Sequence, residues 1–92
     1  MKIIITKELI ESCKIACKGI TSACLCPVAQ AVNPHLPSGQ YATCIGTETS
    51  IYEGTRRVHH FNTTEAVRKF VFAFDDYSNH GGPAPEPIEF EL

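Results

Sequence analysis

Four cysteines lie close together near the start of this 92-residue chain, and a thiol can act as a nucleophile or as a metal ligand. They are Cys13, Cys17, Cys24 and Cys26. A helix over the first pair would place both thiols on one face, so four thiolates could surround a zinc ion or an iron–sulfur centre. The spacing differs from the common Cys-x2-Cys pairs, and the alternative is that these small side chains only pack in the core. Both interpretations stay open, and the prediction includes no bound metal and no cofactor.

Cys26 directly precedes the apolar run Pro27–Val32. Proline fits the first position of a helix because its φ is fixed near the helical value, so we predict a short helix with Cys26 as its N-cap. The helix dipole would then lower the pKa of the thiol and favour the thiolate. Cys26 is therefore a candidate nucleophile, with His35, His59 or His60 as its base. No third group that would orient such a base is indicated by the spacing, and we predict that the protein is not an enzyme.

One basic cluster stands out in the sequence, namely Arg56-Arg57-Val58-His59-His60. Because alternate residues of a strand share a face, Arg56 and His60 would lie on one side. The other side would carry Arg57 and His59. Together with the amides at the predicted helix start, this cluster could bind a phosphate or a small nucleotide. The alternative is a solvated strand whose cations only pair with nearby carboxylates such as Glu48.

The elements that would position these side chains follow from hydrophobic periodicity. Residues Lys2–Thr6 contain three consecutive isoleucines, which indicates a strand that is covered on both sides or flanked by neighbours. A helix is predicted over Lys7–Lys18, ending at Gly19 and followed by a connection over Ile20–Leu25.

Three extended pieces follow a turn-rich loop over Asn33–Gly39, and we expect them to form an antiparallel meander. They are Tyr41–Gly46, Thr49–Glu53 and Thr55–His60. In the first piece, Ala42 and Cys44 share one face. Their small size predicts that a helix packs closely on that face.

A second long helix is predicted over Thr63–Tyr77, after a start that resembles a capping box. Its apolar stripe consists of Val67, Phe70, Val71, Phe74 and Tyr77. Phe72 lies off this stripe, on the face that should look at water. An aromatic residue there can anchor a partner, although a single exposed aromatic residue is also common.

The C-terminal residues 79–87 are rich in glycine and proline and are predicted to be a non-helical linker. Residues Ile88–Leu92 then alternate apolar and acidic side chains, which predicts a last strand that pairs with the first. We therefore predict one α+β domain over residues 1–92, with element order β-α-α-β-β-β-α-β. Its small antiparallel sheet is expected to carry the helices on one face.

Composition narrows the classes of function. The net charge of −2 offers no general attraction for duplex nucleic acid or for an anionic membrane. No apolar run is long enough to span a membrane, and the apolar start is too short for a secretory signal. An odd number of cysteines, five, gives no reason to expect a disulfide framework. We therefore expect a cytoplasmic protein with reduced thiols.

The order of motifs resembles that of small uncharacterised bacteriophage proteins. The shared features are an Ile-rich first strand, a Cys-Pro-Val-Ala helix start, the helical segment Lys69–Asp75 and a C-terminal Phe-Glu-Leu strand. The resemblance implies a phage product that works in the host cytoplasm, where small accessory phage proteins often block a host enzyme or a defence system. It supplies no active-site residues, and Cys13, Cys17 and Cys24 are not part of the pattern.

The leading prediction is a non-catalytic phage protein that binds and inhibits a host or antiphage-defence protein. The residues expected to bind the partner or ligand are Cys26, Arg56, Arg57, His59, His60 and Phe72. One alternative is a sponge that sequesters a small, for example cyclic, nucleotide at the Cys26 helix start with Arg56 or Arg57. A second alternative is a cysteine-based metal or thiol site. The terminal strand and the exposed aromatic residue also predict a homodimer.

Overall fold

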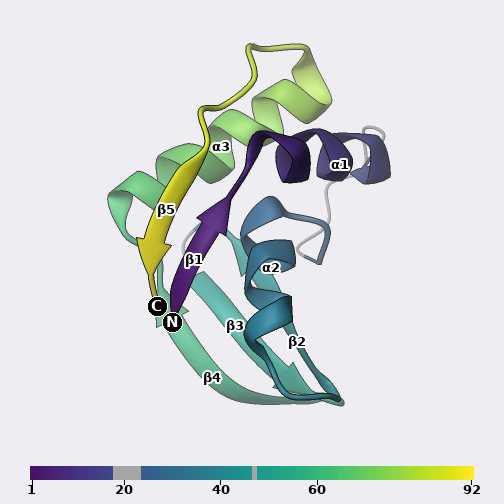
Figure 1. Ribbon diagram of the computed structural model, residues 1–92, viewed down its shortest axis with the longest axis vertical. Helices are drawn as coiled ribbons and strands as arrows, with labels where there is room; N and C mark the ends of the chain where they lie inside the picture. The colour runs from purple at the N-terminus through teal and green to yellow at the C-terminus, as the bar shows by residue number, and fades with distance from the viewer. Residues whose placement is uncertain (18–23, 47) are drawn as a thin grey trace.

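The strands form two separate antiparallel sheets in the computed structural model, which describes residues 1–17, 24–46 and 48–92 (Figure 1). The first sheet pairs β1 (Lys2–Ile5) with β5 (Ile88–Glu91). The second has the order β2-β3-β4 and consists of β2 (Gln40–Ile45), β3 (Glu48–Glu53) and β4 (Arg56–Asn62). The helices are α1 (Lys7–Cys17), α2 (Pro27–Val32), the short 3-10 helix η1 (Asn33–His35) and α3 (Glu65–His80). The predicted α+β class and order of elements are confirmed.

The β1–β5 ribbon joins the two ends of the chain, as the alternation in the last strand predicts. Ile3 lies opposite Phe90 and Ile5 lies opposite Ile88, and both isoleucines of β1 are fully buried. Ile4, between them, is exposed. The prediction that other elements cover both faces of β1 is therefore wrong. The strand is flanked by β5, and only one face of the β1–β5 ribbon enters the core.

Helix α2 packs against β2 on the face that carries the two small residues, as predicted (Figure 1). Ala42 and Cys44 are both buried there. The Asn33 side chain, at the end of α2, accepts a hydrogen bond of 2.7 Å from the Ala42 N–H. This bond satisfies a backbone donor of an edge strand and fixes α2 along β2.

Helix α3 runs three residues further than its apolar stripe predicts. The assignment of Asn79 and His80 to a linker is wrong, because the first residue that breaks the helix is Gly81, whose φ of +72° lies in the left-handed region. At the other end, the N-cap is Thr64, whose hydroxyl accepts from the Val67 N–H at 3.4 Å. Helix α1 ends at Cys17, and the predicted stop at Gly19 lies outside the described residues, as does most of the connection over Ile20–Leu25.

The left-handed conformation at the end of α3 gives a first prediction. Replacing Gly81 with alanine should destabilise the protein by about 1 kcal/mol, because a Cβ is disfavoured at positive φ. Urea unfolding followed by circular dichroism measures this loss, and Gly81→Asn should lose less. An alanine variant as stable as the wild type would contradict the assigned cap.

The core lies between α3, α2 and the inner faces of the two sheets. From α3 it receives Val67, Phe70, Val71 and Phe74, as the predicted stripe requires. Tyr77 is half-buried and donates a hydrogen bond of 2.5 Å to the Glu11 carboxylate, while the Lys14 ammonium lies 3.9 Å from the centre of its ring. These contacts join α1 to α3. Among the helices that the described residues form, none is long and apolar enough to cross a membrane.

Asp75 of α3 is half-buried, and this burial raises the pKa of its carboxyl above the ordinary 3.8. The folded chain therefore holds this proton to higher pH than the unfolded chain, and folding stability falls as pH rises through the raised pKa. Asp75→Asn should thus be more stable than the wild type at neutral pH, and the difference should vanish below pH 3.8. Urea unfolding at both pH values measures it. If the two proteins differed in stability by the same amount at both pH values, the raised pKa of Asp75 would be contradicted.

Candidate functional site

The outer face of the β2–β3–β4 sheet, opposite α2, is the candidate functional surface. Register decides which side chains it carries, because Tyr41 pairs with Tyr52 and Ile45 pairs with Glu48. Its residues are Tyr41, Thr43, Ile45, Glu48, Ser50, Tyr52, Arg57 and His60. Ala42, Cys44, Thr49 and Ile51 on the inner face are buried, whereas Tyr41, Ile45, Arg57 and His60 on the outer face are exposed and Ser50 between them is buried. This sheet therefore presents one face to the core and the other to solvent.

A β-bulge in β4 changes which basic side chains lie together. Ile51 pairs with His59 and Tyr52 pairs with Arg57, so Val58 has no residue opposite it. The extra residue brings Arg57 and His60 to the same side although they are three apart. The predicted groupings of Arg56 with His60 and of Arg57 with His59 are therefore both wrong, because they assume an unbroken strand.

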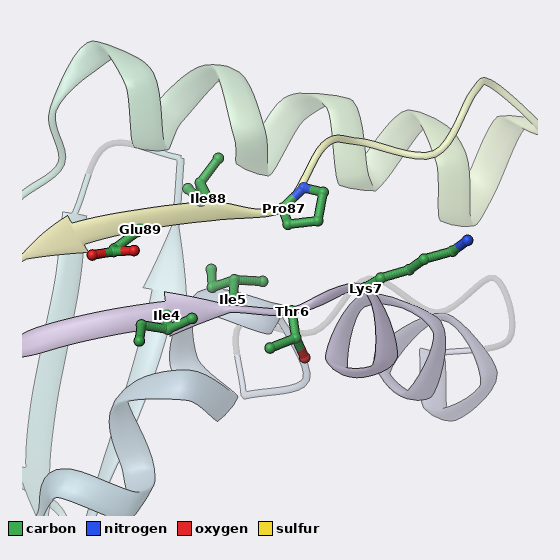
Figure 2. A pocket seen from close by; sticks show the side chains of 7 residues that line it. All are labelled: Ile4, Ile5, Thr6, Lys7, Pro87, Ile88 and Glu89. Carbon is green, nitrogen blue, oxygen red and sulfur yellow. The ribbon is translucent and has the colours of Figure 1, made fainter.

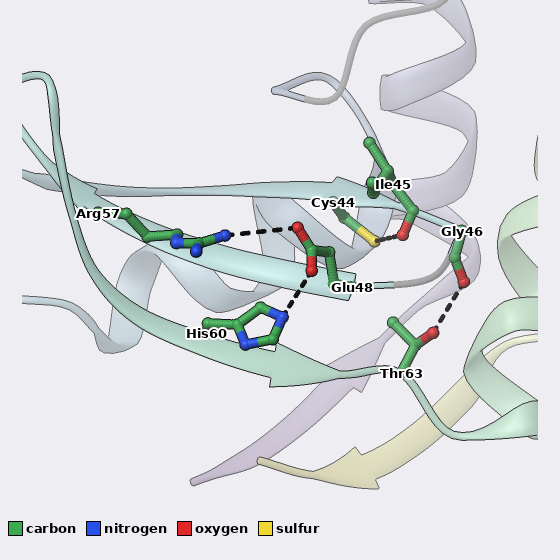
Figure 3. A network of polar contacts seen from close by, with 7 residues as sticks. All are labelled: Cys44, Ile45, Gly46, Glu48, Arg57, His60 and Thr63. Carbon is green, nitrogen blue, oxygen red and sulfur yellow. Dashed lines mark hydrogen bonds and ion pairs between the residues drawn. The ribbon is translucent and has the colours of Figure 1, made fainter.

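Glu48 joins Arg57 and His60 on the outer face, as Figure 3 shows. Its Oε2 lies 2.5 Å from His60 Nε2, and its Oε1 lies 3.6 Å from Arg57 Nη1. Arg56 lies at the far end of β4 and pairs with Glu53 at 3.5 Å. The predicted pairing of this strand with neighbouring carboxylates is therefore present in the structure. Such solvent-exposed pairs contribute only about 0–1 kcal/mol, so the cations can change partners at low cost.

His59 lies apart from this group. It is opposite Ile51, on the inner side of the sheet at its open edge, and its ring stacks on Phe61 with 6.4 Å between the ring centres. The four basic residues of the cluster therefore do not form one site. Arg57 and His60 share a carboxylate, whereas Arg56 and His59 do not contact it among the described ion pairs.

Two tyrosines give the outer face a rigid aromatic end. The rings of Tyr41 and Tyr52 stack with 5.6 Å between their centres and 16° between their planes. The Tyr41 hydroxyl donates to the Gly54 carbonyl at 3.0 Å, which ties the ring to the β3–β4 turn. These residues were not among the predicted site residues. The signal was present, since a helix predicted on the Ala42 face requires that Tyr41 point away from it.

Phe72 projects from α3 beside the opposite end of the same sheet. Its side chain is 57% exposed, in agreement with its predicted place off the apolar stripe. Its ring nevertheless rests on the β2–β3 turn, where a Cβ added to Gly46 would lie 2.8 Å from Phe72 Cε1. The Thr63 hydroxyl donates to the Gly46 carbonyl at 2.7 Å and holds this turn against the start of α3 (Figure 3). Phe72 thus contacts the glycine that directly follows Ile45 in the sequence.

Cys26 occupies the predicted N-cap of α2, but its predicted thiolate character is wrong. A hydrogen bond to the Cys44 side chain and burial both raise the pKa of the Cys26 thiol, and the amides of Val28 and Ala29 only partly oppose them. The prediction considered the helix dipole alone. In the folded chain, loss of solvent and the neighbouring sulfur outweigh it.

The structure does not bring Cys26 and the arginines into one site. Cys26 contacts Cys44 on the inner face, whereas Arg57 lies on the outer face. Arg56 is at the end of the sheet where Gln40 pairs with Glu53, four residues or roughly 13 Å along β2 from Cys44. The nucleotide site predicted from Cys26 with these arginines is therefore not assembled.

Of the remaining thiols, Cys24 is exposed, and the others pack in the core. Cys13 and Cys17 are buried on the inner side of α1, and burial raises the pKa of Cys13 to about 11. Within the described residues, no group of three or more histidine, cysteine or acidic side chains is arranged to hold a metal ion.

An open depression of about 370 Å³ lies at the end of the β1–β5 ribbon (Figure 2). Its walls are formed by Ile4, Ile5, Thr6, Lys7, Pro87, Ile88 and Glu89. None of the predicted site residues lines it. The Thr6 hydroxyl already accepts from the Leu9 N–H at 3.2 Å, and Glu89 pairs with Lys2 at 2.6 Å, so the depression holds few uncommitted polar groups.

Comparisons with protein-family models, with curated proteins and with solved structures find no match for this chain. The functional argument therefore depends on the geometry of the outer face.

Proposed function

We propose that the protein is a non-catalytic binding protein that docks onto a partner protein through the outer face of the β2–β3–β4 sheet. One observation carries this proposal. Six large apolar side chains are exposed in the described chain, and three of them lie on this face or at its end: Tyr41 near the start of β2, Ile45 at the end of β2, and Phe72 beside the glycine that follows Ile45. Exposed apolar residues that cluster mark interaction sites more often than scattered ones do.

The chemistry of the face favours a protein over a nucleic acid. A nucleic-acid site needs uncompensated positive charge, whereas the Glu48 carboxylate compensates the Arg57 guanidinium here and the whole chain has a net charge of −2. Aromatic and arginine side chains are enriched in protein interfaces. Apolar side chains at both ends of β2, with the Arg57 guanidinium on the same face, fit a partner that offers apolar side chains with a carboxylate at the rim.

The proposal also names the class of partner protein. The resemblance to small bacteriophage proteins supports a host or antiphage-defence protein in the host cytoplasm, which binding would inhibit. The nucleotide sponge is the rival from a different class, and the predicted homodimer would make a second copy of the chain the partner.

Copurification from infected host cells tests the proposal. Tagged wild type should retain a stoichiometric protein that tagged Ile45→Asp loses, while calorimetric titration of the purified chain with cyclic nucleotides should give no heat. Tight nucleotide binding by the isolated chain, with no protein retained, would overturn the proposal. Sedimentation of the purified wild type and of Ile45→Asp shows whether the wild type forms a dimer that the variant does not form, in which case the partner is a second copy of the chain.

A further inference from the structure

Two buried thiols from different elements meet behind the candidate surface. Cys26 is the N-cap of α2, and Cys44 lies in β2 on the inner face. Both belong to the same core cluster, and their side chains are within hydrogen-bond contact. The bond between Asn33 and Ala42 fixes the same helix on the same strand, so this contact is a built-in feature of the packing. Both cysteines are reduced in the structure.

We propose that Cys26 and Cys44 form a reversible intramolecular disulfide when the protein meets a peroxide. The bond would join α2 to β2 covalently and close the loop between them. This inference does not depend on the proposed partner binding.

The surroundings assign different roles to the two sulfurs. A hydrogen bond with the Cys26 side chain lowers the pKa of Cys44 below its ordinary value, and the Thr49 hydroxyl adds to this effect, while burial and the Asp75 carboxylate oppose it. In the protonated form the Cys44 thiol donates to the Ile45 carbonyl at 3.4 Å (Figure 3). Thr49 is paired directly opposite Cys44, and its buried hydroxyl has no oxygen or nitrogen partner among the described residues. Cys44 is therefore the attacking sulfur, and Cys26 is the resolving thiol.

The reaction balances in two steps. The Cys44 thiolate attacks one peroxide oxygen, an S–O bond forms, the O–O bond breaks, and the departing hydroxide takes up the proton that Cys44 released and leaves as water. The Cys26 sulfur then attacks the Cys44 sulfur of the sulfenic acid. The S–S bond forms, the S–O bond breaks, and the second hydroxide leaves as water with the proton of Cys26. Two thiols are oxidised and one peroxide is reduced to two waters.

The other two buried thiols described in the structure are less suited to this reaction. Cys13 and Cys17 lie four apart on one helix, and burial raises the pKa values of both. A thiol with a raised pKa supplies little thiolate to attack peroxide. Among the buried thiols, oxidation is therefore expected to select the pair that spans α2 and β2.

Peptide mapping of the full, reduced wild-type chain tests the proposal directly. After treatment with hydrogen peroxide and alkylation, the five thiols should fall to three, and the intact mass should drop by two hydrogens. Chymotrypsin cuts after Leu25 and Tyr41, which separates Cys26 from both Cys24 and Cys44. The expected product is a linked pair of peptides that carry Cys26 and Cys44, and dithiothreitol should restore both. Sulfinic or sulfonic acid, a link through another cysteine, or five unreacted thiols would overturn the proposal.

Matched variants add a second readout. Cys26→Ser and Cys44→Ser should each lose the linked peptides, while Cys24→Ser should keep them. The oxidised wild type should also unfold at a higher urea concentration than the reduced wild type, because the bond restricts the unfolded chain. If the oxidised wild type contained the mapped bond but unfolded at the same or a lower urea concentration than the reduced wild type, the claim that the bond fits the native packing would be contradicted. The mapping is done on the wild type, so it remains decisive even if a serine variant fails to fold.

Discussion

Truncating Phe74 to alanine is expected to lower the free energy of unfolding by about 3–5 kcal/mol. The ring is 2% exposed and lies on the buried stripe of α3, so the substitution removes a large apolar group and leaves a cavity. Small domains have only about 5–15 kcal/mol of stability in total, so this variant should be close to unfolding at room temperature. Urea unfolding followed by circular dichroism measures the loss.

Phe72→Ala is the matched control, since it makes the same chemical change two residues away on the same helix. Because the Phe72 side chain is 57% exposed and touches the turn at Gly46, we expect a loss below about 1 kcal/mol. Equal losses for the two variants would contradict the division of α3 into a buried face and an exposed face.

The second large effect concerns binding. Ile45→Asp should weaken binding to the copurified partner by more than about tenfold, which corresponds to 1.4 kcal/mol. The substitution removes an exposed apolar contact and would force an unpaired charge into the interface. Its effect on folding should be small, because the side chain is 52% exposed. Calorimetric titration of the partner with each variant measures the change.

Ile15→Asp is the control for that experiment. Ile15 is 66% exposed on α1, away from the outer sheet face, so the same substitution there should leave the affinity unchanged. A loss of affinity at Ile15 with none at Ile45 would move the binding surface to α1.

Patterns of neighbouring residues in the sequence predicted most of the helices and strands. The alternation of Ile88–Glu91 with acidic residues predicted the last strand and its pairing with β1, and Pro27 predicted the start of α2. The small residues Ala42 and Cys44 also predicted where a helix packs. These features depend on residues close in the sequence, or on a face whose composition is visible along one strand.

The features that the sequence did not predict depend on contacts between different helices and strands. The bulge at Val58 is a property of the β3–β4 register, so the sequence of β4 alone could not show that Arg57 and His60 share Glu48. The pKa of Cys26 depends on Cys44, which comes from another element. Only the assembled fold supplies that neighbour and the burial that overrides the helix dipole.

Hydrogen exchange of the complex tests the central claim most directly. β2 and β4 are the edges of their sheet, so part of their backbone amides lack a strand partner and exchange measurably in the free chain. If the outer face binds the partner, exchange should slow in Gln40–Ile45 and Arg56–Asn62 and stay unchanged in Lys7–Cys17 and Ile88–Glu91. Protection confined to α1 or to the β1–β5 ribbon would contradict the account.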